Sequence, residues 1–499
     1  MTILDARDRL SGQVLRPDIC IVGAGPAGIT LARELDGHGL EVLVLEGGGR
    51  DPDPELQQLN AGDTTGEPYY PLGSTRLRQL GGTSGHWEGY TRPLDEEDLT
   101  TPLIEPLGAW PFGIEELTEH YRTARELCEV DSDRDLRGET WAELADASLL
   151  DTDPEVLRTE ILLMSPPTRF GERYRAELEA ASDITVLLYA NVVELVSSGD
   201  RVAQARIAHL DGTTQTVEAE RFVLAGGGIE VPRLLLVSDD GSGVGIGNRN
   251  DLVGRHFMEH LHMRGLQLIC EDAEALPFYT DEPEVDGQRI HTMMTVPAEL
   301  RHALGIGNLA VSLLPSRPAA RAFLEEDPLT GSVRSLLRDG AGRPSPDHLA
   351  VQLMTEQVPN ARSRVTLSDR RDALGVPRCL LRWELDEVDR RTLRVGAELV
   401  AGQFAAVGLG RISSAVHGGS TPLAITGGRH HLGTTRMHED PARGVVDVDG
   451  RVHGTDNLYV VSSSTFPTGG YANPTLTVVA MALRLAAHLR TGAPEGGAA

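Results

Sequence analysis

The stretch that decides the fold runs from Asp18 to Gly28 and reads DICIVGAGPAG. Its apolar first half predicts a short strand buried on both faces, as in a parallel sheet. Its glycines follow the pattern G-x-G-x-x-G. In that pattern Gly23 allows a tight turn, Gly25 lets a pyrophosphate approach the backbone, and Gly28 lets a helix pack on the sheet. The stretch therefore predicts the start of a dinucleotide-binding domain.

The flanking residues complete one strand–helix–strand unit. Residues 27–35 predict a helix, and the run Val42-Leu43-Val44-Leu45 predicts the next strand, which closes at Glu46. An acid at this point binds the ribose hydroxyls of a dinucleotide and repels a ribose 2′-phosphate, which disfavours NADP. The fingerprint alone does not separate FAD from NAD.

Three motifs near the carboxy terminus extend the argument. They read HHLGTTRM at 430–437, GTDNLYVV at 454–461 and GYANPTLT at 470–477. Together with the fingerprint they resemble the glucose–methanol–choline (GMC) oxidoreductase family. The resemblance implies an α/β fold, with a Rossmann-like FAD-binding domain and an inserted α+β substrate-binding domain that carries an antiparallel sheet. It also implies FAD as the cofactor.

Oxidising an alcohol requires a hydride acceptor, which the flavin supplies, and a base for the hydroxyl proton. By position in the family motif, His430 is that base, and Asn473 holds the substrate oxygen. Pro474 and Thr475 begin a helix. The N-terminus of that helix is expected to point at the flavin pyrimidine and to stabilise negative charge there.

Two more stretches resemble flavin-contacting segments of the family. LGGTSGHW at 80–87 ends in a His-Trp pair that is closest to the pyranose-oxidase-like branch. His86 matches a position where some relatives bind flavin covalently, and covalent attachment and simple proximity both remain open. VLAGGGIEVPRLLL at 223–236 looks like the strand–turn–helix that returns to the FAD domain. Further cofactor-binding residues implied by the resemblance are Gly81, Gly82, Thr83, Ser84, Val192, Ala225, Gly226 and Ser463.

The expected domain organisation is discontinuous. The FAD-binding domain comprises residues 14–100, 184–270 and 425–492, the last with the catalytic pair. A substrate or cap segment covers 101–183, and the substrate-binding domain covers 271–424.

Composition excludes several kinds of partner. The net charge of −28 repels nucleic acid and anionic membranes, and an aromatic content of 4% argues against a nucleic-acid stacking platform. Four dispersed cysteines form no CxxC pair, so no metal site is predicted. Few cysteines, no signal peptide and no apolar stretch of spanning length indicate a cytoplasmic protein.

The expected function is hydride transfer from a sugar, amino sugar or polyol to FAD. Oxygen, a quinone or another carrier then accepts the electrons. The main alternative is a lyase of the hydroxynitrile-lyase type or another non-redox flavoprotein on the same scaffold. A non-enzymatic flavin-binding protein and an NAD-dependent dehydrogenase are further alternatives.

Overall fold

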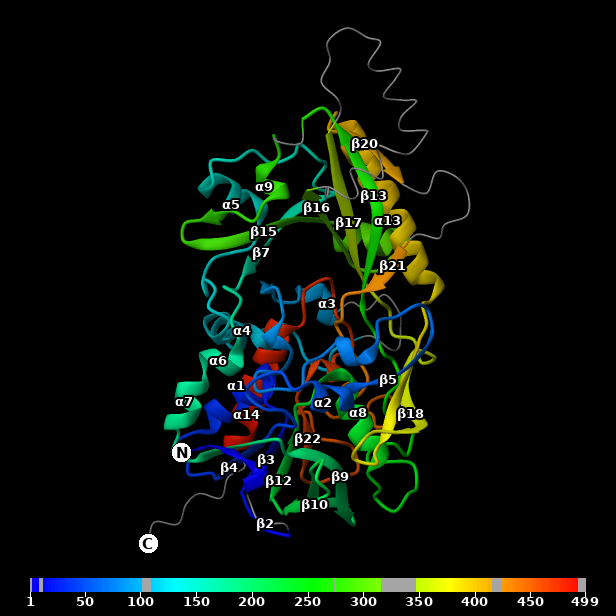
Figure 1. The fold of residues 1–499 in the computed structure, drawn as a ribbon. Helices are drawn as coiled ribbons and strands as arrows, with labels where there is room; N and C mark the ends of the chain where they lie inside the picture. Colours follow the sequence, from blue (N-terminus) through cyan, green and yellow to red (C-terminus); the bar gives the residue numbers. More distant parts are fainter. Residues whose placement is uncertain are drawn as a thin grey trace.

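The computed structural model describes residues 2–8, 12–100, 109–272, 275–315, 347–414 and 424–491. Two parts are stacked on each other, a lower part built on a parallel sheet and an upper part built on a large antiparallel sheet (Figure 1). This arrangement confirms the predicted fold class, an α/β fold with a Rossmann-like domain joined to an α+β domain that carries an antiparallel sheet.

The lower part is organised by six parallel strands in the order β1-β8-β4-β3-β12-β22. Its three central strands are almost entirely apolar and buried, as expected for a sheet covered on both faces. Their neighbours come from distant parts of the chain, so the domain is assembled from separated segments. The strands are β1 (Ile3–Asp5), β8 (Ile184–Leu188), β4 (Val42–Leu45), β3 (Ile19–Val22), β12 (Arg221–Leu224) and β22 (Leu458–Val460).

Two long helices pack side by side in this part. Helix α1 (Pro26–Leu35) follows the fingerprint turn, and helix α14 (Thr475–Thr491) follows the last sequence motif. Both show apolar residues on the buried face at helical spacing. The N-terminal ends of α1 and α14 carry Pro26 and Thr475, and both residues line the same cavity.

The upper part is a nine-stranded antiparallel sheet whose main path is β20-β13-β17-β16-β15-β7-β6. Helix α13 (Glu387–Ala406) packs against β17 and β20. The strands are β6 (Tyr90–Thr91), β7 (Arg158–Met164), β13 (His260–Cys270), β14 (Glu284–Val285), β15 (Gln288–Thr295), β16 (Leu309–Pro315), β17 (Asp347–Glu356), β20 (Gly410–Ser414) and β21 (Ala424–Gly427).

Two smaller sheets and several helices complete the described structure. One sheet contains β2 (Val14–Leu15), β11 (Thr214–Val217), β10 (Arg201–Ala208) and β9 (Asn191–Ser198), and the other contains β18 (Arg364–Arg371), β19 (Pro377–Trp383) and β5 (Gly62–Gly66). The helices include α2 (Pro54–Gln57), α3 (Glu96–Thr100), α4 (Glu115–Leu127), α5 (Gly138–Leu144), α6 (Phe170–Arg173), α7 (Arg175–Ala180), α8 (Gly227–Val237), α9 (Pro277–Thr280) and α10 (Ala298–Leu304).

The predicted domain boundaries do not coincide with the sheets. Strand β13 lies within the predicted FAD segment 184–270 but belongs to the nine-stranded sheet, and β1 joins the parallel sheet although it precedes residue 14. Parts of the predicted segments 101–183 and 271–424 lie outside the described residues. The division into domains therefore stays a prediction.

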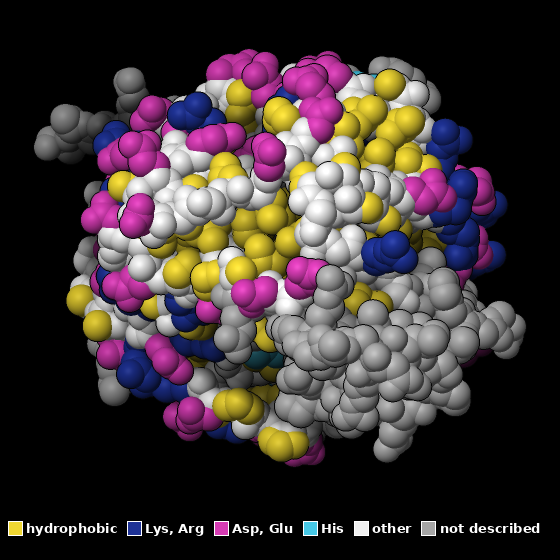
Figure 2. All heavy atoms as spheres, turned by 90° about the horizontal axis from the view of Figure 1, so that it is seen from above, with side chains coloured by type: hydrophobic (Ala, Val, Ile, Leu, Met, Phe, Trp, Pro, Cys, Tyr) yellow, Lys and Arg dark blue, Asp and Glu magenta, His cyan; other side chains and the backbone are white. Residues whose placement is uncertain are grey.

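The surface of the upper part carries charges of both signs. Figure 2 shows acidic and basic side chains around a more apolar middle on the face seen from above. Among the described helices, none combines the length and the apolar character needed to cross a membrane.

Candidate active site

A cavity of about 800 Å³ lies between the two sheets. Its floor is formed where strands β3, β4 and β12 end, at Val22, Leu45 and Leu224, and its roof includes Ser312 of β16 and Met354 of β17. Ligands of open parallel sheets bind at the carboxyl ends of the strands, which is the edge that this cavity occupies.

The fingerprint glycines have three different surroundings. Gly23 has a φ of +110°, and a Cβ there would lie 2.8 Å from the Ala225 carbonyl oxygen. A Cβ at Gly28 would lie 1.9 Å from the Gly23 carbonyl oxygen, so the helix packs against the turn itself. A Cβ at Gly25 would meet nothing within 4 Å, and Gly25 lines the cavity. This open backbone is what close approach of a pyrophosphate requires.

Glu46 holds the turn at the end of β4. One carboxylate oxygen accepts a hydrogen bond from the Ala24 N–H at 3.1 Å and the other accepts one from the Gly48 N–H at 2.8 Å. Burial raises the pKa of Glu46, although these backbone donors and Arg78 oppose the shift. Glu46 also lines the cavity, so it is placed to meet a ribose while it stabilises the turn.

The 80–87 loop lies against the fingerprint turn. The Gly81 N–H donates to the Ala24 carbonyl at 2.8 Å, and Gly81 has a φ of +89° that a side chain would strain. His86 is exposed and lines the cavity, and burial of part of its ring, followed by Arg429 and Arg169, lowers its pKa. The cavity is also lined by the predicted cofactor residues Gly82, Thr83, Ser84, Val192, Ala225, Gly226, Ser463, Pro474 and Thr475. The predicted residues Gly28 and Gly81 do not line the cavity, but both contact the fingerprint turn that does.

A cluster of ion pairs that the sequence analysis did not predict stabilises one wall of the cavity. Glu230, in the first turn of α8, pairs with Arg76 at 2.5 Å and with Arg78 at 3.3 Å. Burial opposes ionisation of Glu230, but Arg233, Arg76 and Arg78 outweigh it and hold its pKa low. Arg76, Arg78 and Glu230 line the cavity, and their pairing anchors the loop that precedes residue 80.

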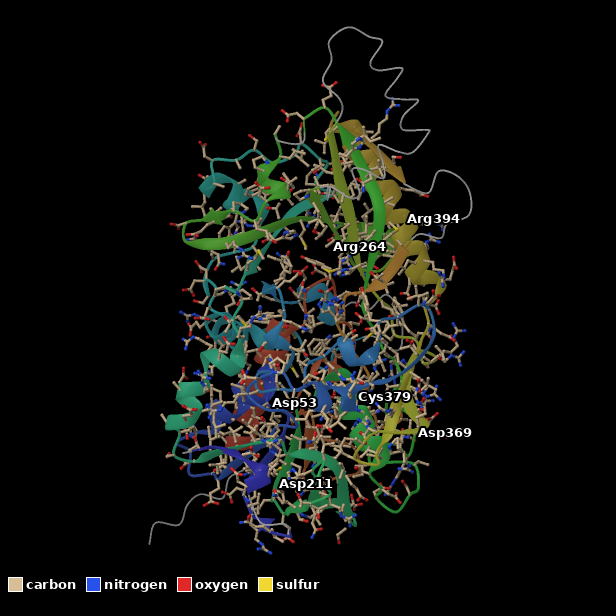
Figure 3. The ribbon with its side chains drawn as sticks, viewed as in Figure 1. Asp53, Asp211, Arg264, Asp369, Cys379 and Arg394 are labelled. Carbon is tan, nitrogen blue, oxygen red and sulfur yellow. The ribbon has the colours of Figure 1, made fainter. Side chains whose placement is uncertain are left out.

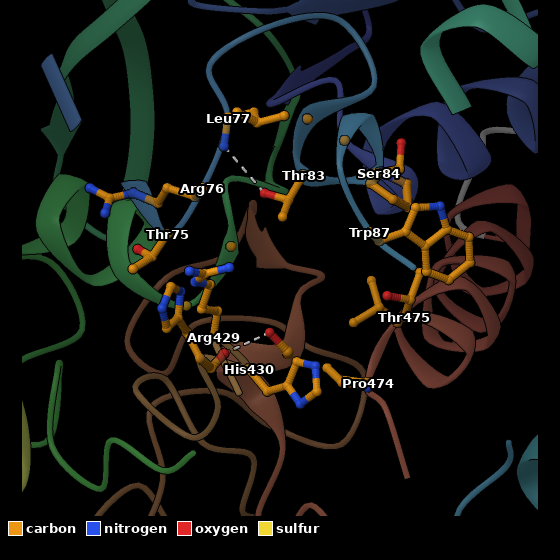
Figure 4. A pocket seen from close by; sticks show the side chains of 18 of the residues that line it. Thr75, Arg76, Leu77, Thr83, Ser84, Trp87, Arg429, His430, Pro474 and Thr475 are labelled. Carbon is orange, nitrogen blue, oxygen red and sulfur yellow. Dashed lines mark hydrogen bonds between the residues drawn. The ribbon is translucent and has the colours of Figure 1, made fainter. Parts of the chain in front are cut away.

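His430 and Asn473, the predicted catalytic pair, lie next to each other in the cavity wall. The His430 Nε2 atom is 3.3 Å from the Asn473 Nδ2 atom. Figure 4 shows the His430 ring beside Pro474 and Thr475 at the start of α14. The structure thus brings both side chains and a helix N-terminus to one point. The catalytic roles of the two residues stay predictions.

Two further histidines surround His430. The His260 Nδ1 atom lies 2.7 Å from the His430 Nδ1 atom, and the ring of His262 lies 6.5 Å from that of His430. Burial lowers the pKa of His430 well below its ordinary value, and His260, His262 and His431 lower it further. His430 is therefore neutral at neutral pH and has a lone pair available. The sequence signal for this cluster was the alternation of His260, His262 and Arg264, which places them on one face of a strand.

Glu259 supports the same segment from below. Its fully buried carboxylate accepts hydrogen bonds from the backbone N–H of His430 at 2.8 Å and of Gly428 at 3.1 Å, and from the hydroxyl of Tyr69. Burial raises the pKa of Glu259 to about 7. The Tyr69 hydroxyl also lies 3.0 Å from His431 Nε2, which ties the two histidines of the motif to one network.

The residues present fit FAD. An open turn at Gly25, an acid at the end of the second strand and two helix N-termini lie along one cavity, whose far end holds a neutral histidine. When bound there, FAD supplies the hydride acceptor. Within the described ranges, no cluster of three or more His, Cys, Asp or Glu side chains is arranged to hold a metal ion.

The chain is similar to known GMC oxidoreductases. The family model described as GMC oxidoreductase matches residues 359–482. The chain is 24% identical to the fructose dehydrogenase large subunit of Gluconobacter japonicus, over 98% of this chain and 100% of that protein. It is 27% identical to paromamine 6′-oxidase of Streptomyces fradiae, over 94% of this chain and 90% of that protein. The crystal structure of a formate oxidase superposes with a TM-score of 0.59 at 17% identity, covering 97% of this chain and 99% of that one.

Proposed function

We propose that this chain, which belongs to the GMC oxidoreductases, oxidises a hydroxylated carbon of a sugar, amino sugar or polyol, with His430 as the base. Its similarity to GMC oxidoreductases supports an FAD-dependent oxidoreductase that acts on CH–OH groups. The substrate class and the roles of individual residues are the proposal.

One observation carries the catalytic assignment. His430 Nε2 and Asn473 Nδ2 meet at 3.3 Å in the wall of the cavity that begins at the fingerprint turn. A substrate hydroxyl placed against both donates its hydrogen to Nε2, in place of the Asn473 amide, and accepts a hydrogen bond from that amide. The substrate carbon is then held in one orientation, which is a large part of the rate gain for such a step.

His430 Nε2 would take the hydroxyl proton, and a bound FAD would accept the hydride from the same carbon, which would leave a carbonyl group. Burial also keeps His430 neutral before the step, so that its Nε2 can accept the proton. The N-terminus of α14 lines the cavity at Thr475 and would supply positive potential to a flavin that gains negative charge there.

The roof of the cavity supports a hydroxyl-rich substrate. His291 and Ser312, on adjacent strands, are hydrogen-bonded to each other at 2.9 Å, and Gln352 lies on the next strand. All three line the cavity and offer hydrogen-bonding groups to several hydroxyls. The names of the relatives fructose dehydrogenase and paromamine 6′-oxidase also point to sugars.

Two arginines favour a neutral sugar over an amino sugar. Arg264 and Arg429 line the cavity, and neither pairs with an acid among the described residues. Figure 3 places Arg264 on the lower half of β13, on the side of the parallel sheet. A protonated amino group at this end of the cavity would be repelled by both cations.

Anaerobic mixing of the purified holoenzyme with a panel of substrates tests the proposal. Sugars and polyols should bleach the flavin absorbance, amino sugars should do so less efficiently, and short aliphatic alcohols should react slowest. A lyase would leave the flavin oxidised throughout turnover. If no hydroxylated donor bleaches the flavin, the proposal is wrong.

Three finer points have their own tests. Oxygen uptake compared with reduction of a quinone or dye identifies the electron acceptor. Flavin that remains with the protein after acid precipitation would establish attachment, and its loss from a His86→Ala variant would place the link at His86. Fractionation of the source cells tests the expected cytoplasmic location.

A further inference from the structure

His260 is the first residue of β13 and is completely buried beside the proposed base. Its ring stands edge-on to that of His430, with centroids 4.9 Å apart and an interplanar angle of 82°. The Nδ1 atoms of the two rings are 2.7 Å apart, so one of them must carry a hydrogen and the other must accept it.

The direction of that hydrogen bond follows from a carbonyl group. His260 Nε2 lies 3.4 Å from the carbonyl oxygen of Gly469, which can only accept. The peptide group that contains this carbonyl is held in turn, because its N–H, which belongs to Gly470, donates to Glu356 at 3.3 Å. His260 therefore carries its hydrogen on Nε2. Burial lowers its pKa to about 4, so at neutral pH the ring is neutral and its Nδ1 is bare.

The tautomer of His260 determines that of His430. Since His260 Nδ1 is bare, His430 Nδ1 must hold the hydrogen that they share. His430 is also neutral, so its Nε2 has the lone pair, and the Asn473 amide donates to it. The reverse direction would turn a lone pair of His260 toward the Gly469 carbonyl and would leave His430 Nε2 protonated and unable to act as a base.

We propose that His260 is a positioning residue that fixes His430 in the tautomer protonated on Nδ1, which leaves Nε2 free to take the substrate proton. The chain of hydrogen bonds starts at Gly469 and ends at Asn473, on the loop that leads into α14. After the step, the protonated His430 still donates to His260 through Nδ1, so the new charge is stabilised by an existing hydrogen bond. The inference rests on the proposed role of His430.

Two substitutions at the same position separate tautomer control from packing. His260→Leu fills the space without an acceptor, whereas His260→Asn puts an oxygen near the place of Nδ1. Loss of the tautomer should lower kcat of His260→Leu about 10²-fold with KM within about threefold, since a general base is worth 10²- to 10⁴-fold. His260→Asn should recover most of that loss. His209→Leu is the control, because His209 is also buried but lies in the β10–β11 turn.

Nitrogen-15 NMR of the histidine-labelled holoenzyme measures the tautomer without turnover, with His430→Asn used to assign the signal. The wild type should show His430 protonated on Nδ1 alone, and His260→Leu should show both tautomers. The inference is overturned if the wild type is protonated on Nε2, if His260→Leu keeps kcat within threefold, or if His260→Asn is no better than His260→Leu. The wild-type spectrum alone shows which nitrogen of His430 is protonated, so it tests the inference even if a variant loses its flavin. It also separates failure of this inference from failure of the proposed function, which the anaerobic bleaching tests.

Discussion

Three glycine-to-alanine substitutions separate cofactor binding from folding in this chain. Each adds the same methyl group, but to a different surrounding. At Gly25 the new Cβ meets no protein atom within 4 Å, at Gly28 it would lie 1.9 Å from the Gly23 carbonyl oxygen, and at Gly402 in α13 it is again in open space. The three variants are therefore matched controls for one another.

The magnitudes follow from these surroundings. Gly402→Ala should raise the free energy of unfolding by about 0.5–1 kcal/mol, because alanine is the better helix former. Gly28→Ala should lower it by about 3 kcal/mol or more, since backbone lies on both sides of the contact and overpacking alone costs about 1–3 kcal/mol. Gly25→Ala should leave folding unchanged but occupy the space that a pyrophosphate needs, which weakens FAD binding by about 10- to 100-fold.

Urea unfolding and the flavin content of each purified variant measure the two effects separately. The expected pattern is a stable Gly402→Ala with full flavin, a stable Gly25→Ala with little flavin, and a Gly28→Ala that is unstable. Full flavin content in Gly25→Ala would refute the placement of the pyrophosphate. Wild-type stability in Gly28→Ala would refute the packing of the helix on the turn.

The remaining predictions concern the acids and the base. A base acts only when it is unprotonated, and burial, followed by His260, His262 and His431, holds the pKa of His430 well below 6.5. We therefore expect kcat/KM to stay level as the pH falls through 6.5. A decline centred at or above pH 6.5 would argue against His430 as the base. Glu46→Leu leaves the N–H groups of Ala24 and Gly48 without their acceptor, which should destabilise the turn by about 1–3 kcal/mol for each group. The flavin content of the purified variant should therefore fall. Normal flavin content would count against this role of Glu46. Glu259→Leu frees the backbone of His430 and should lower kcat by about 10²-fold, as misplacement by about 1 Å does. Glu284→Gln, at the exposed first residue of β14, should leave kcat unchanged. Equal rates in both variants would contradict the support by Glu259.

The central strands of the lower sheet were predictable because they are buried on both faces. Residues 27–35 were predicted as a helix and 42–45 as a strand, and the structure has α1 at Pro26–Leu35 and β4 at Val42–Leu45. Such strands are continuous apolar runs, and their ends are marked by glycine or by an acid. The amino-terminal strand β1 has only three residues and pairs with distant β8, so no local pattern reveals it.

The candidate site was predictable only in part. The resemblance placed His430 and Asn473 in the sequence, and the structure brings them together. The supporting residues Glu259 and His260 were not predicted, because the alternation of His260 and His262 indicates one face of a strand but not a contact with His430. Their contact with His430 depends on how β13 enters the nine-stranded sheet, which is a long-range pairing.

The rate of anaerobic flavin reduction in a His430→Ala variant tests the central claim most directly. Stopped-flow mixing with the best sugar or polyol measures the chemical step alone, before any acceptor is involved. The variant should retain the flavin spectrum of the wild type and reduce its flavin at least about 10²-fold more slowly. Reduction at the wild-type rate would show that position 430 does not supply the base.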